Sequence, residues 1–292
     1  MCLRCDTFHP HQKTAGPKTF VLEAQRDCAE YNSYLHDDHA YVLCYHHVRL
    51  AVNRALWGPE YGLDINIFRH EAYAQRLVGK TVIGTALQCE ARVVGGHFIL
   101  HARYRLSYTS ELHPGRRRKK TVVDVLRPAL PQVVVGHRDS HRPHTGMRKY
   151  LVELIMYGKE DSGVHLCDTC ATDYVVRPLR IDVLAGGERS IEIEVWRDLG
   201  NGRNPFDSSW RAHGELGNGH EGFTNEMQRL SNLAPGSIKT AFESKNPMPI
   251  LPGSRENGRL IEGSWGEDSV VQNTMEMNYT QEIMREFWER RG

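Results

Sequence analysis

The sequence predicts an α+β protein that is mainly antiparallel β-sheet, with one or two packing helices and a poorly ordered C-terminal tail. Two observations carry this prediction. Two long segments have apolar and polar residues in alternation around a Gly-Gly pair, as antiparallel hairpins do, and one segment repeats apolar residues at helical spacing. With 292 residues, 40% of them hydrophobic, the chain can bury one large core or two smaller ones.

Near the N-terminus, residues 39–56 are predicted to form a helix, because apolar side chains recur there every three or four positions. Pro59 follows and cannot continue the helix. Beyond it, Leu63, Ile65 and Ile67 alternate with polar residues, which predicts a short strand or an extended edge.

The first predicted hairpin has residues 81–94 as one arm, Gly95-Gly96 as the turn and residues 97–109 as the other arm. The second arm places apolar side chains on one face and basic or polar side chains on the other. This pattern is typical of an antiparallel sheet with one solvated face.

Between the two hairpins the periodicity is weaker. Residues 121–125 and 132–135 are each predicted to add a strand, and residues 149–157 fit either a strand or a short helix.

The second hairpin organises the segment from 164 to 199. A short strand leads into the Cys167–Cys170 loop, and a longer strand, at about residues 173–185, leaves it. Gly186-Gly187 can join that strand to an antiparallel neighbour, because glycine accepts positive φ. The return strand has two faces, which we predict to carry Ile191, Ile193 and Val195 on one side and Glu192, Glu194 and Trp196 on the other.

Composition divides the chain into three parts. We predict a β-rich α+β domain at residues 1–215, a Gly/Pro/Asn-rich linker or tail at 216–278, and an amphipathic helix at 279–291. The apolar patch of that last helix must pack on the domain or bind a partner. The candidate partner-binding residues are Ile283, Phe287 and Trp288.

Charge and cysteine content restrict the class of protein. With 37 basic and 36 acidic residues the net charge is +1, which gives no reason to expect nucleic acid or an anionic membrane as a partner. The sequence has no uninterrupted run of about 18 apolar residues, so it predicts no membrane-spanning helix. Seven cysteines without a signal peptide indicate a reducing compartment, and we expect an intracellular protein of the cytoplasm or nucleus.

Two Cys-x-x-Cys pairs are the best chemical signal, because a two-residue gap lets both sulfurs reach one zinc ion. A structural zinc could be bound in two ways. Either Cys2, Cys5, Cys167 and Cys170 form one four-thiolate site, or Cys2, Cys5, His9 and Cys28 form a local site and the second pair is only half of another. The alternative is ordinary thiols near turns. A redox pair is disfavoured because a strand, not a helix, is predicted to follow Cys170.

Three histidines, His137, His141 and His144, lie close together in the sequence. Their spacing would need a helix to bring them together, and Pro143 opposes one. We therefore expect a solvated loop.

The basic run has five members, Arg116, Arg117, Arg118, Lys119 and Lys120. It could be a nuclear-import signal or a phosphate-binding patch, or a surface loop without such a role. Without aromatic residues among the basic ones and without a basic net charge, nucleic-acid binding is disfavoured.

No serine-nucleophile triad, phosphate-binding loop, dinucleotide fingerprint or HExxH motif is present, and the sequence favours a non-enzymatic protein.

The order of motifs resembles the region that follows the F-box in many filamentous-fungal F-box proteins. That resemblance spans residues 1–215 and rests on these elements: Cys2-Leu-Arg-Cys5 with Phe8-His9, Val48-Arg-Leu-Ala51, Gly58-Pro59-Glu-Tyr61-Gly62, Cys167–Cys170, Trp196-Arg-Asp-Leu-Gly200 and Trp210-Arg211.

The resemblance implies a fungal intracellular protein-interaction module, similar to the substrate-facing part of F-box proteins, with an unidentified protein partner. The F-box, which would dock on the adaptor of a cullin-type ubiquitin ligase, is absent here, so ligase docking is not implied. The alternatives are a metal- or thiol-dependent enzyme that uses Cys167 and Cys170, and a nuclear nucleic-acid binder that uses the basic run.

Overall fold

The computed structural model describes residues 16–17, 33–37, 41–78, 81–109, 130–136, 144, 146–167, 170–179, 188–203, 208–213, 215–216, 233–244, 254–256 and 259–261. The chain forms two compact units, residues 1–250 and 251–292. The described part of the second unit is an antiparallel pair, β10 (Ser254–Glu256) and β11 (Arg259–Ile261).

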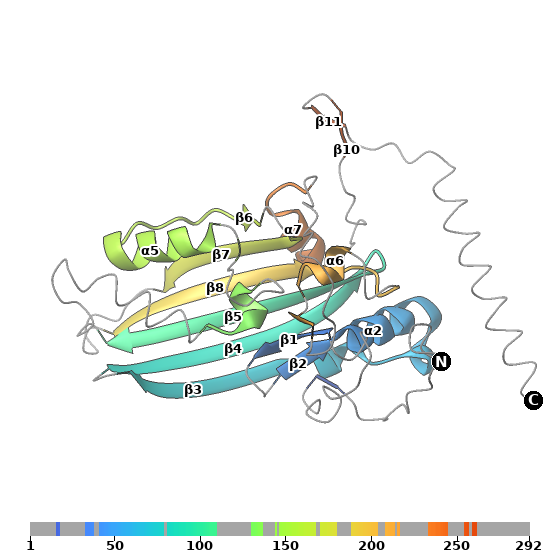
Figure 1. The fold of residues 1–292 in the computed structure, drawn as a ribbon, viewed down its shortest axis with the longest axis horizontal. Coiled ribbons are helices and arrows are strands. Elements are labelled where there is room, and N and C mark those ends of the chain that lie inside the picture. Colours follow the sequence, from blue (N-terminus) through green and yellow to red (C-terminus); the bar gives the residue numbers. More distant parts are fainter. Residues whose placement is uncertain are drawn as a thin grey trace, which may run out of the picture. The chain divides into compact units, whose positions relative to one another are not determined.

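A six-stranded antiparallel sheet forms the centre of the first unit, in the order β3-β4-β5-β8-β7-β6 (Figure 1). Its strands are β3 (His70–Val78), β4 (Thr81–Val94), β5 (His97–Thr109), β6 (His165–Leu166), β7 (Thr172–Leu179) and β8 (Glu188–Asp198). The predicted fold class, α+β with mainly antiparallel sheet, is confirmed.

The hairpin of β4 and β5 has the bounds that the sequence predicts. Gly95 and Gly96 adopt φ values of 56° and 79°, a region that glycine enters without steric cost. The long β3 strand beside β4 was not predicted.

The second hairpin is formed by β7 and β8, and residues 180–187, including the predicted turn, lie outside the described residues. On β8 the alternation is as predicted, because Ile191, Ile193 and Val195 belong to the main core. On the opposite face, Trp196 joins a second, smaller core.

The helix predicted at residues 39–56 is found as α2 (Tyr45–Trp57), and it ends at Gly58, where φ is 112°. Its first predicted turn is instead a strand, β2 (Tyr41–Cys44), which pairs with β1 (Ser33–Asp37). A short strand, β9 (Glu215–Leu216), adds to β1 and completes a three-stranded sheet.

Two predicted strands are wrong. Ile65–Phe68 forms the 3₁₀ helix η3, because the Asp64 carboxylate accepts the Asn66 N–H at 2.9 Å and turns the chain. Gln132–Val135 is the helix α4, in which the Val134 N–H donates to the Pro131 carbonyl. Residues 121–125 lie outside the described residues.

The other short elements connect the sheet to its surroundings. They are η2 (Pro59–Tyr61), α5 (Met147–Tyr157), which resolves the strand-or-helix alternative for residues 149–157, and α6 (Ser208–Arg211).

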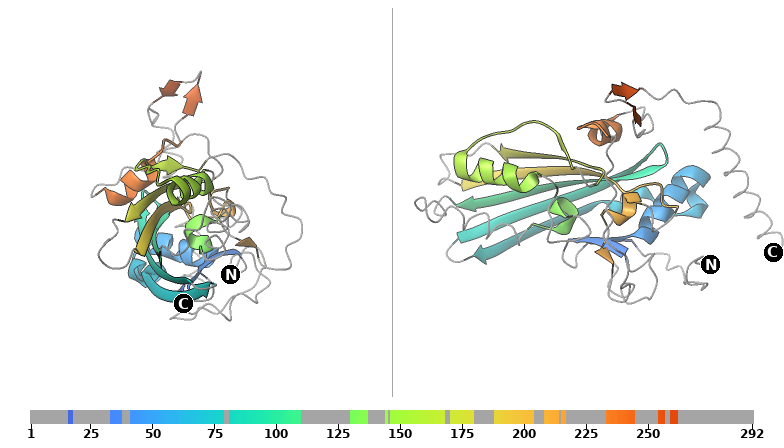
Figure 2. Two further views of the ribbon diagram at one scale, coloured as in Figure 1. Left: turned by 90° about the vertical axis from the view of Figure 1, so that its left-hand side faces the viewer. Right: turned by 45° about the horizontal axis from the view of Figure 1, so that its top comes forward.

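Helices cover both faces of the sheet. Side chains of α2, α4 and α5 pack on one face in the main core. On the opposite face lies α7 (Ser237–Glu243), as Figure 2 shows. Its Ile238, Ala241 and Phe242 pack against Trp196. This helix lies within the segment for which the composition predicts a linker or tail.

The face of the sheet that carries α7 also has a row of arginine–glutamate ion pairs between neighbouring strands. Arg103 donates to Glu194 at 2.6 Å, and Arg105 donates to Glu192 at 2.7 Å. Arg177 donates to both carboxylates. Glu192 and Glu194 are only 2% and 4% exposed, so this part of the predicted solvated face is largely closed.

Among the described residues, no helix combines the length and apolar character needed to cross a membrane.

Candidate metal centre

The Cys167–Cys170 loop lies where β6 passes into β7. The Cys167 N–H donates to the Thr172 carbonyl at 2.9 Å, and the Thr172 N–H donates to the Cys170 carbonyl at 2.8 Å. On the far side, the Asp198 N–H of β8 donates to the Ala171 carbonyl at 2.9 Å. Backbone hydrogen bonds therefore hold Cys167 and Cys170, the two ends of the loop, at the end of the sheet.

His144 comes from a different part of the chain, just before α5. Its carbonyl accepts the Met147 N–H at 3.0 Å, and its ring stacks at 14° on Tyr174 of β7. Gly146, which lies between His144 and Met147 in the sequence, has a φ of 82°. A Cβ at this position would lie 2.8 Å from the Tyr174 hydroxyl oxygen. Glycine at this position therefore lets the chain approach the sheet closely enough to bring His144 to the loop.

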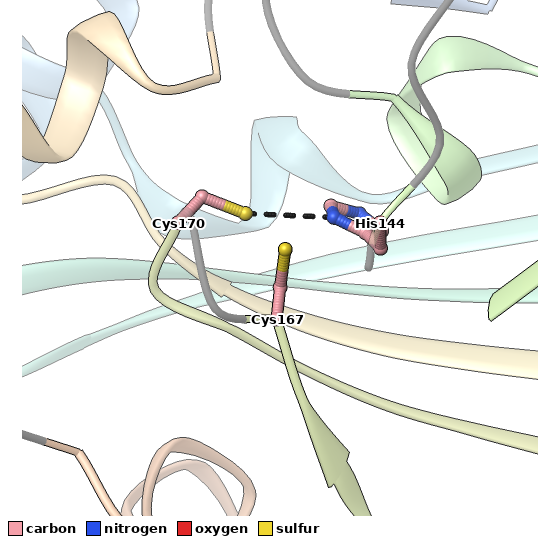
Figure 3. A group of neighbouring side chains, drawn as sticks. All are labelled: His144, Cys167 and Cys170. Atoms are coloured by element: carbon pink, nitrogen blue, oxygen red, sulfur yellow. Dashed lines mark hydrogen bonds between the residues drawn. The ribbon is translucent and has the colours of Figure 1, made fainter. Parts of the chain in front are cut away.

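The three side chains converge on one point (Figure 3). The ligand atoms of His144, Cys167 and Cys170 all lie within 4.8 Å of one another. His144 Nδ1 and Cys170 Sγ are 3.4 Å apart. Around tetrahedral zinc, with Zn–S of about 2.3 Å and Zn–N of about 2.0 Å, sulfur and nitrogen are separated by about 3.5 Å. The group therefore has the spacing that a shared ion requires.

The group is closed to solvent. His144, Cys167 and Cys170 are 0%, 2% and 1% exposed. Burial raises the pKa of the Cys170 thiol well above its ordinary value, and the neighbouring Cys167 raises it further. A thiol with such a raised pKa stays protonated at neutral pH unless nearby positive charges outweigh the effect of burial.

Arg197 of β8 provides one such charge. It is fully buried, and its Nη1 donates to the Gly136 carbonyl at 2.7 Å and to His213 Nδ1 at 3.3 Å. Burial lowers the pKa of Arg197 to about 10, while Cys170 and Cys167 act in the opposite direction. Arg197 therefore stays charged at neutral pH, and its charge acts against the effect of burial on the pKa of Cys170 without outweighing it.

Thr172 supports the same ligands. Its Oγ1 lies 3.3 Å from Cys170 Sγ, so the hydroxyl can donate to a metal-bound thiolate. Such partners orient the ligands of metal sites and adjust their charge. The arrangement can thus hold a metal ion, and imidazole with thiolates is the donor set that zinc prefers.

Of the predicted metal ligands, the structure brings Cys167 and Cys170 together. A strand, β7, follows Cys170, as predicted. The remaining predicted ligands, Cys2, Cys5, His9 and Cys28, lie outside the described residues, as do the basic run at 116–120 and the candidate partner-binding residues Ile283, Phe287 and Trp288.

The solvated loop predicted for the three histidines is wrong for His144, which is fully buried. His137 and His141 lie outside the described residues. The prediction failed because it asked only for a local helix to gather the three histidines, whereas His144 finds its partners across the fold. The available signal was a histidine two residues before Gly146, which precedes a helix, in a chain whose second Cys-x-x-Cys pair was left as half of a site in one of the two predicted arrangements.

Comparisons of the chain with protein-family models, with curated proteins and with solved structures give no match.

Proposed function

We propose that this protein is a non-enzymatic protein-interaction module whose sheet is held together at one end by a structural zinc ion. The observation that supports the zinc site is the convergence of His144, Cys167 and Cys170 within 4.8 Å. Burial of all three ligands favours a closed structural site, because a catalytic zinc keeps a position open to water or substrate.

A structural zinc of this kind takes four protein ligands. Three come from the described residues, and the fourth comes from the remaining cysteines or histidines of the chain. Arg197 and Thr172 stabilise the thiolates around the ion. Because His144 and Cys170 are 26 positions apart, with α5 and β6 between them, the ion would link two segments that are distant along the chain.

The zinc site predicts a measurable metal content. Protein purified without chelator should carry zinc. The double variant Cys167→Ser/Cys170→Ser should bind one ion fewer per chain and should no longer unfold in a cooperative transition, because metal binding is coupled to folding. His144→Ala should weaken binding of the same ion. Zinc analysis and thermal unfolding of each variant, with and without a chelator, are the measurements.

Cys89→Ser is the matched control, since Cys89 is also buried but lies on β4. It should keep the zinc content of the wild type. A folded double variant with unchanged zinc content would refute the site.

The interaction module is supported by the ordered motifs that resemble the region after the F-box, and by exposed apolar residues on β3 and β4. Tyr73 and Leu77 are both 72% exposed, and Val82 is 49% exposed. In the register of the two strands Leu77 lies opposite Val82, so these side chains share one face. Exposed apolar groups of this kind are typical of surfaces that contact other proteins. Because β3 is the end strand of the sheet, we propose that the partner adds an extended segment along it.

If the partner binds along β3, substitutions of the exposed apolar residues on this strand should weaken its capture, whereas substitutions elsewhere should not. The double variant Tyr73→Ser/Leu77→Ser should capture a given partner at least about tenfold less well than the wild type, since buried aromatic and aliphatic anchors carry most binding energy. Tyr157→Ser is the control, because Tyr157 is 75% exposed but lies on α5. Equal capture by all three proteins in a quantitative pull-down would exclude β3 as the binding edge.

An enzyme that uses Cys167 and Cys170 is the second candidate. The described residues supply three protein ligands, the number that catalytic zinc sites have. X-ray absorption spectroscopy of the zinc protein separates the two candidates. Four protein ligands support the structural site, and a bound water in the fourth position supports the enzyme.

A further inference from the structure

The end strand β3 lacks the features that usually protect the edge of a sheet. It has 9 residues, contains no proline, and pairs with β4 residue by residue without a bulge. Residues 72–75 carry no charge. Natural sheets protect an end strand by making it short or charged, or by a bulge or a proline. The end strand on the other side, β6, has only 2 residues. The β3 edge can therefore accept a further strand along its length.

This edge is apolar and open to solvent. Tyr73 and Leu77 are each 72% exposed, and Ala74 and Gln75 are exposed as well. Because side chains alternate along a strand, Tyr73, Gln75 and Leu77 lie on one face, the face of the sheet that carries α7. An amide thus lies between two large apolar side chains. The order apolar, amide, apolar is the same in both chain directions, so the strand has the pattern that pairing with itself requires.

Symmetry restricts how two copies of β3 could pair. A two-fold axis perpendicular to the sheet places the second β3 antiparallel to the first and keeps both cores on the same side. The registers that pair most of the strand have Tyr73, Ala74 or Gln75 on this axis.

The residue opposite Leu77 distinguishes these registers. With Tyr73 on the axis, Leu77 faces Arg69 of the second copy, and with the next residue on the axis it faces Glu71. With Gln75 on the axis, Leu77 faces Tyr73 of the second copy. Only this last register places the exposed apolar side chains opposite each other. It also brings the two Gln75 amides together, and each amide can donate to the other.

We infer that β3 pairs with β3 of a second copy of this chain, with Gln75 on the two-fold axis. The inference rests on the proposed function, in which a partner adds along β3, and it names that partner. The pair of Tyr73 with Leu77 occurs twice, once on each side of the axis, and cross-strand pairs of this kind stabilise sheets. Because only one strand of each copy takes part, the contact is small, and the dimer should dissociate on dilution.

The first experiment is analytical ultracentrifugation of the full-length protein over a concentration series. The wild type should pass from monomer to dimer as its concentration rises. Tyr73→Ser/Leu77→Ser should raise the dissociation constant of the dimer at least about tenfold, because both apolar pairs are lost. Tyr157→Ser is the control, since Tyr157 is 75% exposed but lies on α5, and it should associate as the wild type does.

The second experiment tests the register by disulfide formation under mild oxidation. Gln75→Cys should form a disulfide-linked dimer, because opposed residues of an antiparallel pair have Cα atoms about 4.5–5.5 Å apart, which a disulfide can bridge. Glu71→Cys is the matched control, since the two copies of residue 71 would lie at opposite ends of the paired strands. The wild type, oxidised in parallel, gives the background from the native cysteines.

Three results would overturn the inference. One is a wild type that stays monomeric up to about 1 mM, where even weak association is visible. Another is a dimer that Tyr73→Ser/Leu77→Ser retains at full strength. The third is a disulfide formed by Ala74→Cys or Tyr73→Cys but not by Gln75→Cys.

Failure of the proposed function gives a different result from failure of this inference. A monomeric wild type whose capture of another protein is lost in Tyr73→Ser/Leu77→Ser would exclude the second copy and keep β3 as the binding edge. A monomeric wild type with unchanged capture by that variant would exclude both.

Discussion

At the scale of single residues, Arg197 shows how the fold accommodates a buried charge. Its guanidinium is fully buried yet donates to the Gly136 carbonyl and to His213. A buried cation is costly unless other groups compensate it. Burial lowers the pKa of Arg197, and Cys170 and Cys167 act against that effect without cancelling it, so the arginine and the candidate zinc ligands influence one another.

Glu194 is a buried anion with a different set of partners. Burial by itself raises the pKa of Glu194, but the nearby His101 ring, the hydrogen bond from Arg103 and the charge of Arg177 outweigh it, and the pKa falls to about 2. A carboxyl group whose pKa is lowered by folding stabilises the native state above its unfolded pKa. That contribution is lost as the pH falls from about 4.5 to about 2.

This shift predicts a pH-dependent effect of Glu194→Gln. At pH 7 the variant should be less stable than the wild type by about 2 kcal/mol, a value reduced for the partly exposed arginines. The difference should shrink toward zero as the pH approaches 2. Denaturant unfolding at several pH values measures it.

Glu90→Gln is the control, because Glu90 also contacts His101 but its side chain is 49% exposed. It should change stability by less than about 0.5 kcal/mol. A difference between Glu194→Gln and wild type that is constant across this pH range would contradict the assignment.

At the scale of elements, the position of α7 depends on one carboxylate from β7. Asp173 accepts the N–H groups of Gly236, Ile238 and Lys239 at 2.9, 2.9 and 3.0 Å. Asp173 is fully buried. Burial raises its pKa, and the three backbone hydrogen bonds act against that rise. The sheet thus supplies the N-terminal cap of a helix about sixty residues away in the chain.

Asp173→Ala is therefore expected to release α7. The variant leaves three N–H groups without their acceptor and should lose about 2–4 kcal/mol of stability, with faster hydrogen exchange concentrated in α7. Asp161→Ala is the control, since Asp161 caps the Gly163 N–H in an exposed turn. Unchanged exchange in α7 would show that its apolar contacts suffice without the cap.

Elements also differ in how far the sequence predicted them. The arms of the β4–β5 hairpin were predicted to the residue, because alternation and a Gly-Gly turn are local signals. η3 and α4 were predicted as strands. Four-residue apolar segments carry too few positions for a reliable period, and in each case a local hydrogen bond decided the conformation.

At the scale of the whole molecule, the candidate metal centre lies where separate segments meet. His144 precedes α5, the cysteines follow β6, and Arg197 is the next-to-last residue of β8. An ion bound at this point would fix contacts between residues that are distant in sequence, so its removal should reduce the cooperativity of the whole first unit rather than loosen one loop.

The sequence by itself determined the fold class, the two central hairpins and the pairing of Cys167 with Cys170, because alternation, glycine turns and two-residue spacing are set by near neighbours. Only the tertiary structure decided that His144 joins these cysteines, that α7 covers the second face of the sheet, and that Glu192 and Glu194 are buried beneath arginines. The physical reason is the same in each case. These side chains take their roles from atoms that lie far away in the sequence, and no local periodicity records which distant segments pack together.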